Sequence, residues 1–200
     1  MHIEFFLEEP SVETFLNGVL QQILPASTTW KPIVFQGKPD LLANLERRLK
    51  GYKSWMPKDW KIVVLINEDR ADCLALKKTM EAAAAQAGLI TKSAAGGGSF
   101  TVLNRIAVEE LEAWYFGDIE ALVTAYPRVP KNLGANAHYR NSDTIGGGTR
   151  EALERVLQRA GYFGGGLSKI ELAREMARHM KAARNTSSSF KCFTEGLAAL

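Results

Sequence analysis

The stretch KIVVLINEDRADC, from Lys61 to Cys73, is typical of a buried strand that ends in a turn rich in acids. Residues Ile62 to Ile66 form a continuous β-branched and leucine run, the pattern of a strand buried on both faces of a parallel sheet. The run stops at four polar side chains, Asn67, Glu68, Asp69 and Asp72. We expect these side chains at the carboxyl end of the strand, where open α/β sheets bind ligands.

The acid cluster has two interpretations. Close carboxylates repel one another, so they need solvent or a cation between them, and Mg²⁺ is a typical cation for oxygen ligands. Alternatively, Asp69 or Asp72 only caps the next helix, predicted over the alanine-rich residues 71–88 and closed by Gly88, because acids favour a helix start. This stretch alone leaves both interpretations open.

The beginning of the chain repeats the order strand, acid, helix. His2–Leu7 is predicted to be a strand, and Glu8 and Glu9 follow it. A helix is then expected, with Ser11 as its N-cap and Glu13 in its first turn. If the two predicted strands are neighbours in a parallel sheet, the acids that follow them lie at one edge. The sequence therefore predicts one site built from two turns.

A helix predicted after Asp40 has leucines on one face and basic side chains on the other. With Trp55 and Trp60 nearby, this face could bind a phosphate backbone and stack bases. A charge run is otherwise a solvated helix face, and tryptophans are ordinary core residues. The net charge of +3 and the pI near 8.8 favour neither interpretation. The basic residues are Arg47, Arg48, Lys50, Lys53 and Lys58.

Later elements are less distinct. Strands are predicted over 33–36, 89–94 and 100–106, and a helix over part of 105–118, where Glu109, Glu110 and Glu112 either face solvent or complete a metal site. Residues 126–148 are typical of a loop. Two helices capped by Thr149 and Ser168 follow, then a serine-rich loop at 185–190 and a tail whose Phe190 and Phe193 are expected to be buried.

The composition predicts a globular protein, because 46% of the 200 residues are hydrophobic. We expect an α/β domain over residues 1–125 and a loop and helical extension over 126–200. Cys73 and Cys192 lack the spacing of a disulfide scaffold or a metal site, which favours a reduced cytoplasm. No stretch is predicted to cross a membrane or to direct export.

Four segments together resemble one family: LEEPSVETFL (7–16), INEDRADC (66–73), RIAVEELEAWYFGD (105–118) and ARNTSSSF (183–190). They are similar to the bacterial Toprim-like proteins catalogued as domain of unknown function 4276, and the likeness covers nearly the whole chain. The resemblance implies a Toprim-like (Rossmann-like), mainly parallel α/β sheet flanked by helices, with a C-terminal helical extension. Topoisomerases, primases and the nucleases of the overcoming-lysogenization-defect family share this fold. In it, a glutamate after the first strand and an acidic pair after a later strand hold Mg²⁺.

The resemblance also implies roles for individual residues. Glu8 matches the first-strand glutamate, Glu13 the acid in the following helix, and Asp69 the second member of the acidic pair. Asn67 stands where the family usually has aspartate, so a neutral oxygen replaces a charged ligand and lower metal affinity is expected. Glu9 replaces the usual glycine, which would hinder the approach of a substrate phosphate.

The prediction for function is a nuclease or related phosphoryl-transfer enzyme that depends on Mg²⁺ or Mn²⁺. The resemblance adds nucleic acid and an ATPase as expected partners, since family members are often found beside ATPases and a role in defence against phage or plasmids is suspected. The alternative is an inactive adaptor or regulator of a partner ATPase, which Asn67 favours. The candidate residues are Glu8 and Asp69 as catalytic groups; Glu8, Asn67, Asp69 and Glu110 as metal ligands; and Glu13, Glu68 and Asp72 as supporting groups.

Overall fold

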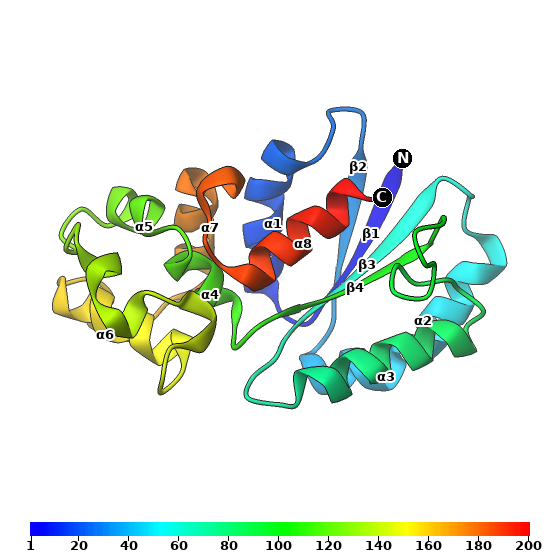
Figure 1. Cartoon of the computed structure of the whole chain (residues 1–200), viewed down its shortest axis with the longest axis horizontal. Coiled ribbons are helices and arrows are strands. Elements are labelled where there is room, and N and C mark those ends of the chain that lie inside the picture. Colours follow the sequence, from blue (N-terminus) through cyan, green and yellow to red (C-terminus); the bar gives the residue numbers. More distant parts are fainter.

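The protein is built on one parallel sheet with helices on both faces (Figure 1), and the computed structural model describes all 200 residues. The sheet order is β2-β1-β3-β4, and every neighbouring pair is parallel. This confirms the predicted α/β class. Because β1 and β3 are neighbours, Leu7 lies opposite Leu65. The strands are β1 (His2–Leu7), β2 (Thr29–Val34), β3 (Trp60–Asn67) and β4 (Val102–Ala107).

The helices form three groups (Figure 1). One face of the sheet carries α1 (Pro10–Ile23) and α8 (Ser188–Ala198), and the other carries α2 (Lys38–Trp55) and α3 (Cys73–Gln86). The third group lies beyond the carboxyl ends of the strands. It contains α4 (Leu111–Phe116), α5 (Ile119–Ala125), α6 (Thr149–Arg159) and α7 (Lys169–His179), with three short 3-10 turns between α5 and α6.

The apolar run of β3 is explained by two separate cores. Val63 and Leu65 belong to a large core that includes α1 and the helices after β4. Ile62, Val64 and Ile66 belong to a smaller core under α2 and α3. Alternate side chains of a strand point to opposite faces, so a strand with two covered faces needs apolar residues at every position. This is the pattern that the sequence displays.

The C-terminal helices pack tightly on the rest of the chain. Phe190 and Phe193 are fully buried, and their rings lie 5.0 and 5.1 Å from the ring of Trp114. The predicted burial of the tail is therefore confirmed. The large core contains residues from both sides of residue 125, the predicted boundary between the two parts of the chain. This boundary stays a prediction.

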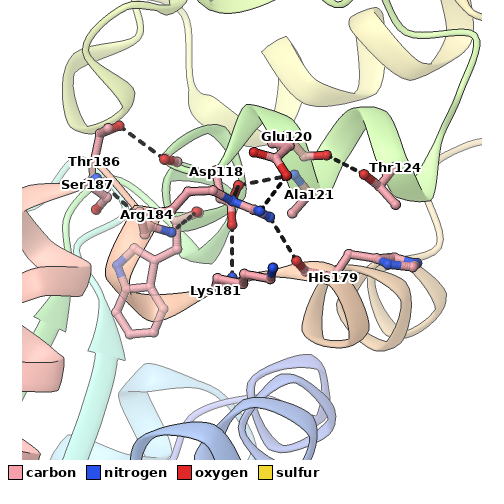
Figure 2. A network of polar contacts seen from close by, with 12 residues as sticks. Asp118, Glu120, Ala121, Thr124, His179, Lys181, Arg184, Thr186 and Ser187 are labelled. Atoms are coloured by element: carbon pink, nitrogen blue, oxygen red, sulfur yellow. Dashed lines mark hydrogen bonds and ion pairs between the residues drawn. The ribbon is translucent and has the colours of Figure 1, made fainter.

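A buried ion pair fixes the segment between α7 and α8 to the start of α5 (Figure 2). The side chain of Asp118 is fully buried and caps α5 by accepting from the Ala121 amide. It also accepts from the Lys181 amide at 2.9 Å and from Arg184 Nε at 2.7 Å, while another guanidinium nitrogen of Arg184 bonds Glu120. Both oxygens of Asp118 are thus satisfied inside the protein, as burial of a charge requires.

Three predicted elements differ from the structure. Residues 89–94 form turns with a single bridge from Thr91 to Val102, because the chain must reverse at Gly96 and Gly97, whose φ angles are positive. The strand predicted at 33–36 lies at 29–34. Residues 105–107 belong to β4, and the helix after it starts only at Leu111.

Three predicted helix caps are also wrong. Two of these helices begin early because Pro10 and Pro39 favour the first helical turn. The observed N-caps are Glu9, Gly37 and Gly148 in place of Ser11, Asp40 and Thr149. The predicted serine-rich loop is shorter than expected, since α8 begins at Ser188 with Ser187 as its cap. The caps Asp72 and Ser168 are confirmed.

The contact between α1 and α7 provides a test of the packing. A Cβ added at Gly18 would lie 2.6 Å from Cβ of Ala177, so Gly18→Ala should push the helices apart. We expect the free energy of unfolding to fall by about 1 to 3 kcal/mol, although alanine favours a helix more than glycine does. Urea denaturation measures this change. The second substitution Ala177→Gly should restore most of the loss, and a stable Gly18→Ala variant would contradict the packing.

Candidate active site

The parallel register brings Glu8 beside the end of β3, as the sequence predicts. The amide of Asn67 donates to Glu8 Oε1 at 2.8 Å. Glu8 is only 4% exposed, and its other oxygen, Oε2, has no hydrogen-bond partner. A buried carboxylate oxygen without a partner is costly, so Glu8 is oriented by the backbone but left with one unsatisfied oxygen.

A cavity of about 500 Å³ opens at this edge of the sheet. Its lining includes Glu8, Glu9, Asn67 and Asp69, together with two lysines from other parts of the chain. The structure therefore brings the two predicted catalytic acids, Glu8 and Asp69, to the same cavity. Both carboxylates and ammonium groups line the cavity, a mixture that suits an anionic substrate held near a cation.

Lys38, the first residue of α2, closes one side of this cavity. Its Nζ donates to Asp69 Oδ2 at 2.8 Å and to the main-chain oxygens of Asn67 and Glu68 at 3.1 and 2.9 Å. The lysine thus holds the turn after β3 from outside and neutralises Asp69 in the absence of another cation.

Lys169 enters the cavity from the start of α7, far away in the sequence. Its Nζ lies 3.1 Å from Glu9 Oε2. Burial works against the charge of Lys169, but Glu112 and Glu9 outweigh it and raise the pKa of the ammonium group. The C-terminal helices therefore contribute a positive charge to a site whose acids follow β1 and β3.

The electrostatics of Glu8 are dominated by burial. Burial raises the pKa of its carboxyl group to about 7, and the charges of Asp69 and Glu9 add to this shift. The Asn67 amide and Lys38 oppose it. Glu8 therefore exchanges a proton near neutral pH, where general bases operate efficiently.

The two turns at this edge are strained and bonded to each other. Asp69, Arg70 and Glu109 have φ angles of 50°, 61° and 59°, in the left-handed region that non-glycine residues rarely occupy. The Asp69 amide donates to the Glu109 carbonyl, and the Glu109 amide donates to Glu68 Oε2 at 2.9 Å. Glu68 thus joins the turns after β3 and β4, which agrees with a supporting role.

The remaining predicted site residues lie elsewhere. Glu110 lines a neighbouring cavity of about 200 Å³ that Asp69 also borders, and its Oε2 accepts from the Arg150 amide at 3.1 Å. Asp72 caps α3 by accepting from two amides, so the capping interpretation holds for this residue. Glu13 lies in the first turn of α1 and borders neither cavity.

Sequence reasoning missed two residues near the site, Lys38 and Lys169. Lys38 had a recognisable signal, since it follows a predicted strand as the acids do. Lys169 had no such signal in the sequence, because it lies 160 positions away from its partner Glu9. Glu112 was expected either in solvent or at a metal, and the first alternative is wrong because Glu112 is 2% exposed. Burial raises its pKa to about 7, although Lys169 opposes the shift.

The donor set fits a magnesium ion with few protein ligands. No group of three or more His, Cys, Asp and Glu side chains is arranged around one point. Mg²⁺ usually keeps several waters and binds one or two carboxylates plus substrate phosphate. Glu8, with its free Oε2, and Asp69 supply two carboxylates at one cavity, and Asn67 supplies a neutral oxygen.

Comparison with known proteins gives a family without an activity. The family model described as "Domain of unknown function (DUF4276)" matches residues 7–198. No curated protein and no solved structure matches the chain. None of the helices combines the length and the hydrophobicity that a membrane span requires.

The buried Glu112 predicts a pH-dependent stability. Its pKa is about 7 in the folded protein against 4.5 for an ordinary glutamate, so folding is favoured below pH 4.5 and loses this contribution as the pH rises through 7. The loss is on the order of 3 kcal/mol. In EDTA, Glu112→Gln should flatten the decrease in melting temperature between pH 5 and 8. Glu195→Gln, at an exposed site on α8, should leave the decrease unchanged. An unaltered slope in Glu112→Gln would contradict the assignment.

Proposed function

The chain belongs to the family described as domain of unknown function (DUF4276), and we propose that it is a Mg²⁺-dependent phosphoryl-transfer enzyme, a nuclease acting on nucleic acid. The observation that carries the proposal is the Glu8 carboxylate. It is buried, oriented by the Asn67 amide, unpartnered at Oε2, and placed on a cavity shared with Asp69 and two lysines.

The acids and the lysines of the cavity would have different roles. Glu8 and Asp69 would hold the metal, and Glu8, with its pKa near 7, can also accept a proton from an attacking water. Lys38 and Lys169 are placed to contact the phosphate oxygens of a substrate in the same cavity. When bound, Mg²⁺ would stabilise charge that develops on the phosphoryl group and lower the pKa of a bound water.

The resemblance to Toprim proteins supports the same chemistry. It also supports a setting in the bacterial cytoplasm, with a partner ATPase and a role in defence against phage or plasmids. Two departures from the family pattern lie in the cavity itself: Asn67 replaces an acid, and Glu9, in place of glycine, is neutralised by Lys169 at 3.1 Å.

The second candidate function is an adaptor without catalysis. The observation that favours it is the pairing of the acids with lysines: Lys38 bonds Asp69, and Lys169 bonds Glu9. In an adaptor these pairs are permanent, and the cavity edge only stabilises the fold. In an enzyme they are exchanged for metal and phosphate when substrate binds.

Substitution of the acids separates the two functions. With Mg²⁺ or Mn²⁺ and supercoiled or single-stranded DNA, Glu8→Gln and Asp69→Asn should each lower turnover by roughly a hundredfold or more. Melting temperatures should show that both variants fold, and Glu195→Gln is the matched control at an exposed site. Metal-dependent cleavage that survives both substitutions would refute the site. A parent chain that neither binds metal by calorimetry nor cleaves DNA would favour the adaptor.

The neutral residue in the site gives a second test. Asn67 is 4% exposed and its amide nitrogen lies 3.5 Å from Glu9 Oε1, so Asn67→Asp adds a charge among acids. We expect Mg²⁺ to bind more tightly, by on the order of 1 kcal/mol or more. Without metal the same charge should lower the melting temperature. Calorimetry and thermal unfolding with and without Mg²⁺ measure both effects. Unchanged metal affinity would show that Asn67 does not contact the ion.

A further inference from the structure

A row of aromatic rings lies at the amino end of the sheet, opposite the candidate active site. The ring centroids of Tyr52 and Trp55 are 5.1 Å apart, those of Trp55 and Trp60 are 5.5 Å apart, and those of Trp60 and His2 are 4.2 Å apart. Trp55 is 57% exposed, an unusual position for a side chain of this size. One tryptophan of the row therefore faces solvent while its neighbours support it.

Hydrogen bonds to Glu4 and Thr29 fix the two ends of the aromatic row. Glu4 is 3% exposed and accepts from the hydroxyl of Tyr52 at 3.1 Å, and its other oxygen lies 3.3 Å from His2 Nε2. His2 is bonded in turn to Thr29 at 2.7 Å. Tyr52 and His2, the two ends of the row, are thus fixed by polar contacts to Glu4 and Thr29, so Trp55 lies on a preorganised support.

Positive charge surrounds this row. Residues 47–61 contain one acid, Asp59, and six basic residues, so the segment has a net charge of +5, whereas the whole chain has +3. All other residues together sum to −2. Lys53 and Lys58 border a cavity of about 200 Å³ that Trp60 also lines, and both are exposed. The basic residues are Arg47, Arg48, Lys50, Lys53, Lys58 and Lys61.

Helix α2 connects this surface to the candidate active site. It begins at Lys38, which bonds Asp69, and ends at Trp55. Its 18 residues span about 27 Å. Arg47 and Arg48 are exposed along its course; one donates to Asn44 and the other lies over the ring of Phe35, so neither is neutralised by a carboxylate. Positive charge thus extends from the aromatic row to the middle of α2, whereas Asp40 and Glu46 carry negative charge on the half of the helix nearer the candidate active site.

We propose that Tyr52, Lys53, Trp55, Lys58 and Trp60, here called the Trp55 platform, bind single-stranded nucleic acid and that the strand continues past Arg47 and Arg48 on α2. The inference deepens the proposed function and rests on it for the identity of the substrate. Trp55 stacks on a base, while Lys53 and Lys58 contact the adjoining phosphates.

The chemistry of the platform favours this ligand over others. Aromatic stacking combined with a basic groove is how proteins bind single strands without sequence preference. A duplex does not present its base faces to Trp55, so it can use only the charges. A protein partner rich in acids would satisfy the lysines, but it would not need the exposed ring of Trp55.

The test is a binding measurement in EDTA, where metal-dependent cleavage does not occur. A fluorescein-labelled oligothymidine should bind the wild-type chain and quench its tryptophan emission. Trp55→Ala should weaken binding about tenfold or more, and Trp55→Phe should retain most of it. Lys53→Ala with Lys58→Ala should reduce the slope of log affinity against log salt by about 1.4. Leu74→Ala and Lys131→Ala, both at exposed positions away from the platform, are the matched controls and should bind as the wild type does.

Two further measurements distinguish a failure of the platform from a failure of the proposed function. Glu8→Gln should bind the oligonucleotide normally even where it has lost cleavage. In the presence of metal, Trp55→Ala should raise KM for the oligonucleotide and leave hydrolysis of the small diester bis(p-nitrophenyl) phosphate unchanged. Platform-dependent binding by a chain that never cleaves DNA would refute the enzyme and support the platform. A wild-type chain that binds no oligonucleotide, equal affinity for a duplex, or full affinity in Trp55→Ala would each overturn the platform.

Discussion

The hydrogen bond from the Asn67 amide to the Glu8 carboxylate organises the chemical edge of this protein. It joins the last residue of β3 to the first residue after β1, so it exists only because these strands are parallel neighbours. The bond favours the charged form of Glu8, but burial outweighs it and leaves the pKa at about 7. Oε1 of Glu8 accepts this hydrogen bond, and Oε2 has no hydrogen-bond partner. A fold that only needed a helix start after β1 would not keep an acid in this state, because its burial is costly.

The lysines determine how far the negative charge of this edge is balanced. Lys38 binds two main-chain oxygens of the turn after β3 as well as Asp69, so it stabilises the positive φ angles of Asp69 and Arg70. Strain of this kind costs roughly 1 to 3 kcal/mol for each residue and persists where surrounding contacts enforce it. The same contacts fix the position of the Asp69 carboxylate. Lys38 thus both stabilises the strained turn and balances the charge of Asp69.

Local patterns were sufficient for β1, for β3 and for the edge that these two strands share. The apolar run before Asn67 and the acids after Leu7 predicted two strands and their shared edge. This was possible because the burial of a strand and the position of its carboxyl end can be recognised from consecutive residues. Lys169 and Glu112 were not predictable in this way, since their environment is created by α7 packing against the rest of the chain. The N-caps predicted at Ser11 and Asp40 were wrong because the fixed φ of Pro10 and Pro39 favours the first helical turn, so α1 begins at Pro10 and α2 at Lys38. The strand predicted at 89–94 failed because its apolar residues border a reversing turn.

The neutral Asn67 is consistent with the count of charges around the cavity. Glu8, Glu9 and Asp69 face Lys38 and Lys169 there, so three carboxylates meet two ammonium groups. Aspartate at position 67 would raise the imbalance from one negative charge to two in a partly buried space, where Coulomb repulsion is poorly screened. Glu9 is the acid that forms an ion pair with Lys169. The acid at position 9 thus fixes the start of α7 to the cavity, and the amide at position 67 adds no further negative charge there.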